Sequence, residues 1–227
     1  LSDYNLMNAE EKLQAELLSG LYDLSTANGM TAYVMKKNYI TKGVDTDWMS
    51  QPLQNQFNHS HSLYISGGTE GFRFGTDLSY NHEGGVMKKS YRNRMSVGIY
   101  VDYRVGKLQI RNNVSYDLAR SSDSPYGSFS DYTKQQPYYP IYDDNGKLLQ
   151  MLAIGIPNPL YEATLGNFSR GESSNLTNNL SFYWFINDHF RLKAKVAYSE
   201  RTDKQEQFTD PRSAQYNTYD YQEGDGV

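Results

Sequence analysis

The chain has 227 residues and a formal net charge of −4, and no basic block stands out, so the composition gives no support to nucleic-acid binding. Cysteine is absent, which excludes disulfides, thiolate metal sites and cysteine nucleophiles. No run approaches the roughly 18 apolar residues that a membrane-spanning helix requires. The chain is polar overall but contains 21 tyrosines, a mixture that favours β structure.

The N-terminal stretch predicts one short amphipathic helix. Apolar residues from Leu6 to Leu21 recur mostly at helical spacing. Asn8 is a candidate N-cap, and Glu11 lies three residues further on, as in a capping box. We therefore expect a helix at about residues 8 to 20. Residues 21 to 59 show no sustained period, and we expect an irregular loop there.

Three strand hairpins are predicted further along the chain. The first surrounds the turn "TEG" within residues 61 to 81, and the second runs from Met95 to Leu118 around "VGK". Apolar and polar residues alternate through the second hairpin, and only Asn112 breaks the pattern. The third hairpin, at 175 to 200, turns at "NDH", and beyond Ser199 we assign no firm strand.

The connections between these strands differ strongly in length. Turns of about three residues alternate with long excursions, one of which carries prolines at a frequency that excludes a central strand or a long helix. In an antiparallel up-and-down sheet every second connection lies at the same end. One end then carries only tight turns and the other only long loops, as in transmembrane β-barrels.

The expected fold is therefore all-β, with antiparallel up-and-down strands of a large transmembrane β-barrel, about six of them here, long extracellular loops and one short N-terminal helix. Even the smallest such barrels need about eight strands, so we expect an excerpt of a longer chain. The expected regions are a helix-containing extracellular loop region at 1–60, two barrel hairpins at 61–118, a long extracellular loop at 119–174, a barrel hairpin at 175–200, and the start of the next extracellular loop at 201–227.

Alternation assigns each strand residue to one of two faces. Six apolar residues are expected to face outer-membrane lipid: Val97, Ile99, Val101, Leu180, Trp184 and Val196. Six charged residues from the alternate positions are expected to face a water-filled lumen or a plug: Arg73, Asp77, Asp102, Arg104, Arg111 and Lys193. A secreted β-rich binding or adhesin module with a soluble sandwich core would show similar alternation. The unequal loops and the charged second face favour the barrel.

The tyrosine-rich loop "SPYGSFSDYTKQQPYYPIYDD" at 124 to 144 is the best candidate for ligand contact. Aromatic rings with hydroxyl groups suit stacking on sugars, and carboxylates accept hydrogen bonds from sugar hydroxyls. The candidates are Tyr126, Phe129, Tyr132, Tyr138, Tyr139, Tyr142, Asp131 and Asp143. The same tyrosines could instead pack the loop against itself or against a partner, and "DDNG" is typical of a hairpin turn.

Catalytic and metal-binding chemistry has little support in the sequence. His59 and His61 would share a face of one strand, but no third ligand is evident, so we expect no metal or cofactor. No Ser/His/Asp constellation and no phosphate-binding glycine loop is present. We therefore expect that the protein is not an enzyme.

Several segments, taken in order, resemble the SusC/RagA-like TonB-dependent outer-membrane transporters of Bacteroidetes. They are "YNLMNAEEK", Asp47-Trp48, "HSLYISGG" at 61 to 68, "NHEGGVMKKS" at 81 to 90, "SPYGSF" at 124 to 129, "NPLYEA" at 158 to 163 and "FTDP" at 208 to 211. The resemblance implies a piece of a plugged barrel of about 22 strands.

The same resemblance implies a location in the cell outer membrane and a set of partners. Members of this family pair with a SusD-like surface lipoprotein, import glycans or peptides, and draw energy from the inner-membrane TonB complex. The sequence contains no TonB box, plug domain or C-terminal barrel strand that we recognise. Energy coupling is therefore expected to belong to an N-terminal part that is missing here.

Overall fold

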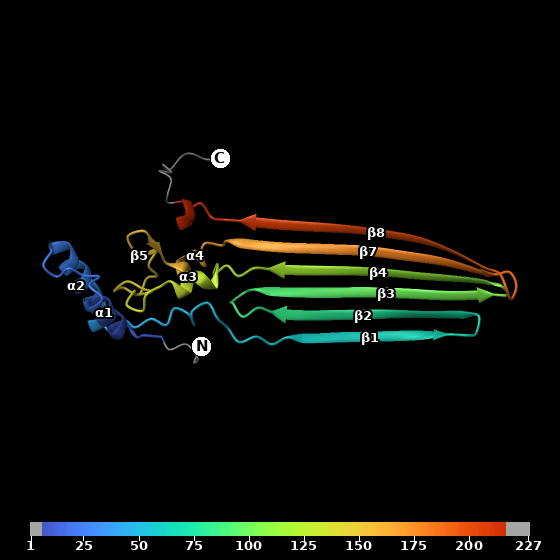
Figure 1. The fold of residues 1–227 in the computed structure, drawn as a ribbon, viewed down its shortest axis with the longest axis horizontal. Coiled ribbons are helices and arrows are strands. Elements are labelled where there is room, and N and C mark those ends of the chain that lie inside the picture. Colours follow the sequence, from blue (N-terminus) through green and yellow to red (C-terminus); the bar gives the residue numbers. More distant parts are fainter. Residues whose placement is uncertain (1–5, 217–227) are drawn as a thin grey trace.

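The computed structural model describes residues 6–216. Its main feature is one six-stranded antiparallel sheet with the strand order β1-β2-β3-β4-β7-β8, which confirms the expected all-β architecture (Figure 1). The strands are β1 (His59–Gly68), β2 (Phe72–Gly84), β3 (Tyr91–Val105), β4 (Leu108–Ser122), β7 (Phe168–Phe185) and β8 (Arg191–Phe208). Among the described residues, no helix is both long enough and apolar enough to cross a membrane.

The two ends of the sheet differ, as Figure 1 shows. The β1–β2, β3–β4 and β7–β8 connections are short and lie at one end, called the turn end below. The β3–β4 turn needs a glycine because Gly106 has a φ of 55°. Helices and long connections gather at the other end, called the loop end, and form a cap on the strands.

Strands β7 and β8 are longer than the sequence predicts. The prediction placed this hairpin at 175 to 200, yet the two strands pair from Phe168 with Phe208 down to Phe185 with Arg191. The expectation of no strand after Ser199 was therefore wrong. Residues 200 to 207 are polar on both faces and carry no apolar alternation, but backbone pairing with β7 needs none. Residues 217–227 of the predicted final loop lie outside the described residues.

The N-terminal region contains two helices. The first, α1 (Ala9–Leu18), confirms the prediction: the Glu11 backbone N–H donates to Asn8 Oδ1 at 2.9 Å, and the Asn8 N–H donates to the Glu11 carboxylate at 3.0 Å. The second, α2 (Ala27–Thr41), was not predicted, because its apolar residues form no single stripe. The expectation that residues 21 to 59 are irregular was wrong for this stretch.

The hydrophobic core lies in the cap. Its buried residues are Ala9, Leu13, Tyr22, Trp48, Tyr132, Tyr138, Tyr139 and Leu152. The connection between β4 and β7 contributes short elements to the cap, namely α3 (Phe129–Thr133), β5 (Met151–Ala153), β6 (Ile156–Pro157) and α4 (Pro159–Glu162), and η1 (Ala214–Tyr216) follows β8. The sheet itself forms a single layer.

Candidate functional site

The strand register divides the sheet into two faces of opposite character. Directly paired residues of an antiparallel sheet lie on the same face. Val101 pairs with Asn112, Asn112 with Leu180, and Leu180 with Val196, so these four residues form one row. The same register places all six predicted lipid-facing residues on this apolar face: Val97, Ile99, Val101, Leu180, Trp184 and Val196.

The apolar face is open. Ile99 is 51% exposed and Val196 is 62% exposed, and large apolar side chains on the other strands are similarly accessible. Within residues 6–216 the second sheet is the two-stranded pair β5 and β6 in the cap, and it does not cover this face. A soluble sandwich core therefore does not form in the described part of the chain. An open apolar surface of this extent marks contact with a lipid or protein partner.

The apolar band has the height of a membrane and an oblique border. On β3 it runs from Met95 to Val105, about 34 Å along the strand and about 24 Å of height at a tilt of about 45°. The border residue Met95 shares its row with Ser174 and Thr202, so the band ends earlier on β7 and β8. Such an oblique border is expected where tilted strands cross a flat membrane surface, because each strand then crosses that surface at a different residue.

Asn112 lies within the apolar band, and the register runs through it without a shift, which excludes a bulge. Its side-chain oxygen is buried without a hydrogen-bond partner, as is that of Asn178 on the adjacent strand. Nothing in the structure explains these two asparagines.

The opposite face of the sheet is polar and carries ion pairs. Arg73 and Arg111 both pair in register with Asp102, and Arg111 Nε donates to the Asp102 carboxylate at 2.8 Å. Gln109 donates to the same carboxylate at 2.7 Å. All six charged residues that the sequence assigned to the lumen lie on this polar face: Arg73, Asp77, Asp102, Arg104, Arg111 and Lys193.

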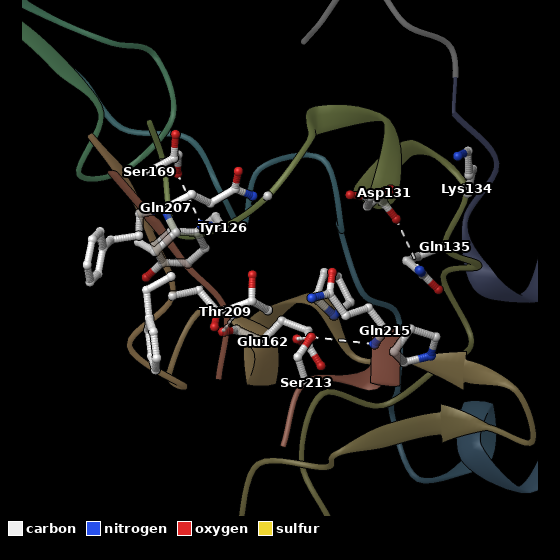
Figure 2. Close-up of a pocket in the computed structure, with 18 residues that line it drawn as sticks. Tyr126, Asp131, Lys134, Gln135, Glu162, Ser169, Gln207, Thr209, Ser213 and Gln215 are labelled. Carbon is white, nitrogen blue, oxygen red and sulfur yellow. Dashed lines mark hydrogen bonds between the residues drawn. The ribbon is translucent and has the colours of Figure 1, made fainter. Parts of the chain in front are cut away.

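A pocket of about 490 Å³ opens where the cap meets the ends of β7 and β8 (Figure 2). Three segments quoted above for the family resemblance, at 124–129, 158–163 and 208–211, contribute to its wall. Its labelled lining residues in Figure 2 are Tyr126, Asp131, Lys134, Gln135, Glu162, Ser169, Gln207, Thr209, Ser213 and Gln215. The fold therefore brings together segments that are far apart in the sequence.

Both carboxylates of this pocket accept hydrogen bonds from the protein itself, and Glu162 connects two segments of the chain. Glu162 accepts hydrogen bonds from Ser213 Oγ at 2.7 Å and from the Ala214 N–H at 2.8 Å. Asp131 accepts one from the Ser128 N–H at 3.2 Å. Apart from Lys134, much of the remaining wall consists of amides, hydroxyls, prolines and aromatic rings. Such a surface suits an uncharged ligand that hydrogen-bonds and stacks.

The eight predicted ligand residues do not lie together in the structure. Tyr126 and Asp131 line the pocket. Tyr132, Tyr138 and Tyr139 are 0%, 2% and 7% exposed, so they pack within the cap, as in the packing alternative, and they do not line the pocket. They are buried because the cap uses their rings as its core.

The other predicted ligand residues lie outside the pocket. Phe129 is partly buried in α3, and Tyr142 is 56% exposed. Asp143 accepts hydrogen bonds from the backbone N–H groups of Asn145 and Lys147 at 2.9 and 2.8 Å, which confirms the predicted "DDNG" turn. Glu162 and Thr209 were missed as pocket residues, although their segments had been singled out for the resemblance.

A buried ionic cluster connects α1, α2 and the tyrosine-rich loop. Tyr138 donates to Glu16 at 3.0 Å, Tyr22 donates to it at 2.5 Å, and Lys36 Nζ lies 3.8 Å from the same carboxylate. Burial raises the pKa of the Tyr22 and Tyr138 hydroxyls, and it lowers the pKa of Lys36 despite the nearby Glu16 carboxylate. Tyr138 therefore has a structural role in this cluster.

Comparisons with known proteins bear on the fold of this chain. No family model and no curated protein matches the chain. Among solved structures, the chain is similar to the structure of the RagAB peptide transporter, with a TM-score of 0.68 and 16% sequence identity. The two share a fold. The match covers 88% of this chain and 26% of that one, so the chain spans about a quarter of the transporter chain's length. At this identity the likeness shows the fold alone.

Proposed function

We propose that this chain is part of a TonB-dependent importer of the outer membrane. The observation that carries the proposal is the single-layer sheet, which has one open apolar face of membrane height and one polar face. In a barrel the apolar face contacts lipid and the polar face lines an aqueous interior. The shared fold with part of the RagAB peptide transporter supports the same assignment.

In this proposal the cap lies outside the cell and the turn end lies in the periplasm. The imported cargo is a glycan or a peptide, and a SusD-like surface lipoprotein is the partner at the loop end. Coupling to the TonB complex belongs to parts of the transporter outside this chain. The chain contributes lipid contact, lumen surface and cargo contact, and it needs no catalytic group for these tasks.

Single cysteines at the two ends of the sheet test the orientation. The chain has no cysteine, so Asn145→Cys in the cap and Asp188→Cys in the β7–β8 turn would each give one label site in a cysteine-free full-length protein. Both residues are exposed. A membrane-impermeant maleimide should label Asn145→Cys on intact cells, and Asp188→Cys only after the outer membrane is permeabilised.

Equal labelling of both variants on intact cells would contradict the proposed topology. Recovery of the full-length protein in the soluble fraction would reject the membrane assignment altogether. An outer-membrane protein of known topology with a single periplasmic cysteine is the control for permeability.

The pocket between the cap and β8 is the proposed point of cargo contact. Gln207→Ala removes a side-chain amide from the pocket wall, whereas Gln205→Ala removes the same group two residues earlier on the same face of β8, outside this pocket. We expect Gln207→Ala to lower cargo affinity about five- to twelvefold, as for a lost hydrogen bond of about 1 to 1.5 kcal/mol. Uptake of labelled cargo is the measurement.

Equal uptake kinetics for the Gln207→Ala and Gln205→Ala variants would remove this pocket from the transport pathway. Surface immunolabelling of both variants should show equal amounts of protein, so that a change in uptake reports binding and not abundance.

A further inference from the structure

A charged rim follows the apolar band on the same face of the sheet. The row that contains Met95 and Leu118 ends the continuous run of apolar rows on β3 and β4, and Tyr91 lies two rows beyond it on the same face. The next row toward the loop end contains Arg120, Glu172 and Lys204 on three neighbouring strands. Long charged side chains therefore stand directly at the border of the apolar surface.

These side chains form a pocket of about 260 Å³. It is called the rim pocket here, and its lining residues are Tyr91, Arg120, Ser121, Arg170, Gly171, Glu172, Lys204 and Glu206. The lining includes three cations and two carboxylates, which leaves a net charge of +1. The rim pocket lies entirely within β3, β4, β7 and β8, so the paired backbone holds its geometry.

Glu172 orients two of the three cations. Arg120 Nε donates to Glu172 Oε2 at 2.8 Å, and Lys204 Nζ lies 4.0 Å from Glu172 Oε1. The side chains of Arg120 and Lys204 remain more than half exposed. The arginine keeps further N–H donors, and the ammonium keeps its own, for an anion that approaches from outside.

The third cation, Arg170, has an aromatic partner and, within the described part of the chain, no ion pair. Its guanidinium lies 4.5 Å from the centre of the Phe168 ring. Glu206 is its register partner on β8, but among residues 6–216 no carboxylate lies within ion-pair distance of it. The ring supports the guanidinium plane, and no carboxylate of residues 6–216 occupies its N–H donors.

We propose that the rim pocket binds the phosphate group of a membrane lipid headgroup, with the acyl chains of the lipid lying along the adjacent apolar face. Arginine and lysine together suit a phosphate, because a guanidinium forms paired hydrogen bonds to two phosphate oxygens. The continuity of the pocket with the apolar band selects a lipid as the occupant, because one molecule then meets both surfaces. This inference rests on the proposed membrane location.

Retention of a defined lipid tests the inference. The full-length protein is equilibrated in detergent with an equal mixture of phosphatidic acid and the diacylglycerol with the same acyl chains, and the lipid that co-purifies is quantified by mass spectrometry. The wild-type protein should be enriched in phosphatidic acid. Lys204→Gln and Arg120→Gln should each lower that enrichment by about threefold or more.

Lys195→Gln is the matched control. It removes the same charge from the same strand, but Lys195 pairs with Ser181 on the polar face, away from the rim. The control should keep the wild-type enrichment. Equal enrichment in Lys204→Gln, Lys195→Gln and wild-type protein would overturn the inference.

Further outcomes show whether the lipid assignment alone or also the proposed function is wrong. If inorganic phosphate at the same concentration as the lipid displaces phosphatidic acid fully, the pocket binds phosphate without regard to the lipid, and the proposed occupant is wrong. If the protein stays in the membrane fraction and shows the expected cysteine labelling but no lipid enrichment, this inference fails alone. If it leaves the membrane fraction, the proposed function fails as well.

Discussion

Val196→Arg should cost about 2 to 4 kcal/mol of folding stability in the membrane and should lower the amount of assembled full-length protein. Val196 is 62% exposed and shares its row with Leu180 and Val101 within the apolar band. On a lipid-facing surface the guanidinium must leave water near the middle of the bilayer. Urea unfolding in lipid vesicles and the quantity of folded protein in outer-membrane fractions are the measurements.

The neighbouring residue provides the control for this prediction. Ala197 lies on the same strand and on the opposite, polar face, where it pairs with Asn179. Ala197→Arg should change the stability by less than about 1 kcal/mol, because the new charge faces water. Ile99→Arg on β3 should repeat the effect of Val196→Arg. Equal stability losses for Val196→Arg and Ala197→Arg would show that the apolar face does not contact lipid.

Glu16→Gln should destabilise the cap by about 3 kcal/mol. The substitution keeps the shape of the side chain but leaves Lys36, whose side chain is 15% exposed, without its carboxylate. Tyr22 and Tyr138 would also lose a charged acceptor. Hydrogen exchange should show faster opening of α1 and α2, while the strands of the sheet keep their protection.

A second ion pair between the same two helices serves as the control. Glu10 pairs with Lys37, and their side chains are 53% and 41% exposed. Glu10→Gln should cost less than about 1 kcal/mol, because water screens an exposed pair. If Glu10→Gln and Glu16→Gln accelerate exchange in α1 equally, burial of the Glu16 cluster does not stabilise the cap.

Local patterns in the sequence determined the two faces of the sheet. Alternation along 95 to 118 and 175 to 200 assigned Ile99, Leu180 and Val196 to one face, and the register agrees because side chains of a strand alternate with period two. The short turns and the Asn8–Glu11 capping box were equally local, since each depends on residues within a few positions.

The tertiary structure decided which residues are buried, how far β8 extends and which residues line the pockets. Tyr138 contacts Glu16 across 122 residues of sequence, and that contact makes it a core residue where the sequence suggested ligand binding. Strand β8 extends to Phe208 because β7 supplies its backbone partners. The pocket between the cap and β8 and the rim pocket likewise combine residues from separate segments of the chain. Burial and pocket geometry depend on long-range packing, whereas the alternation of a strand is a property of the strand itself.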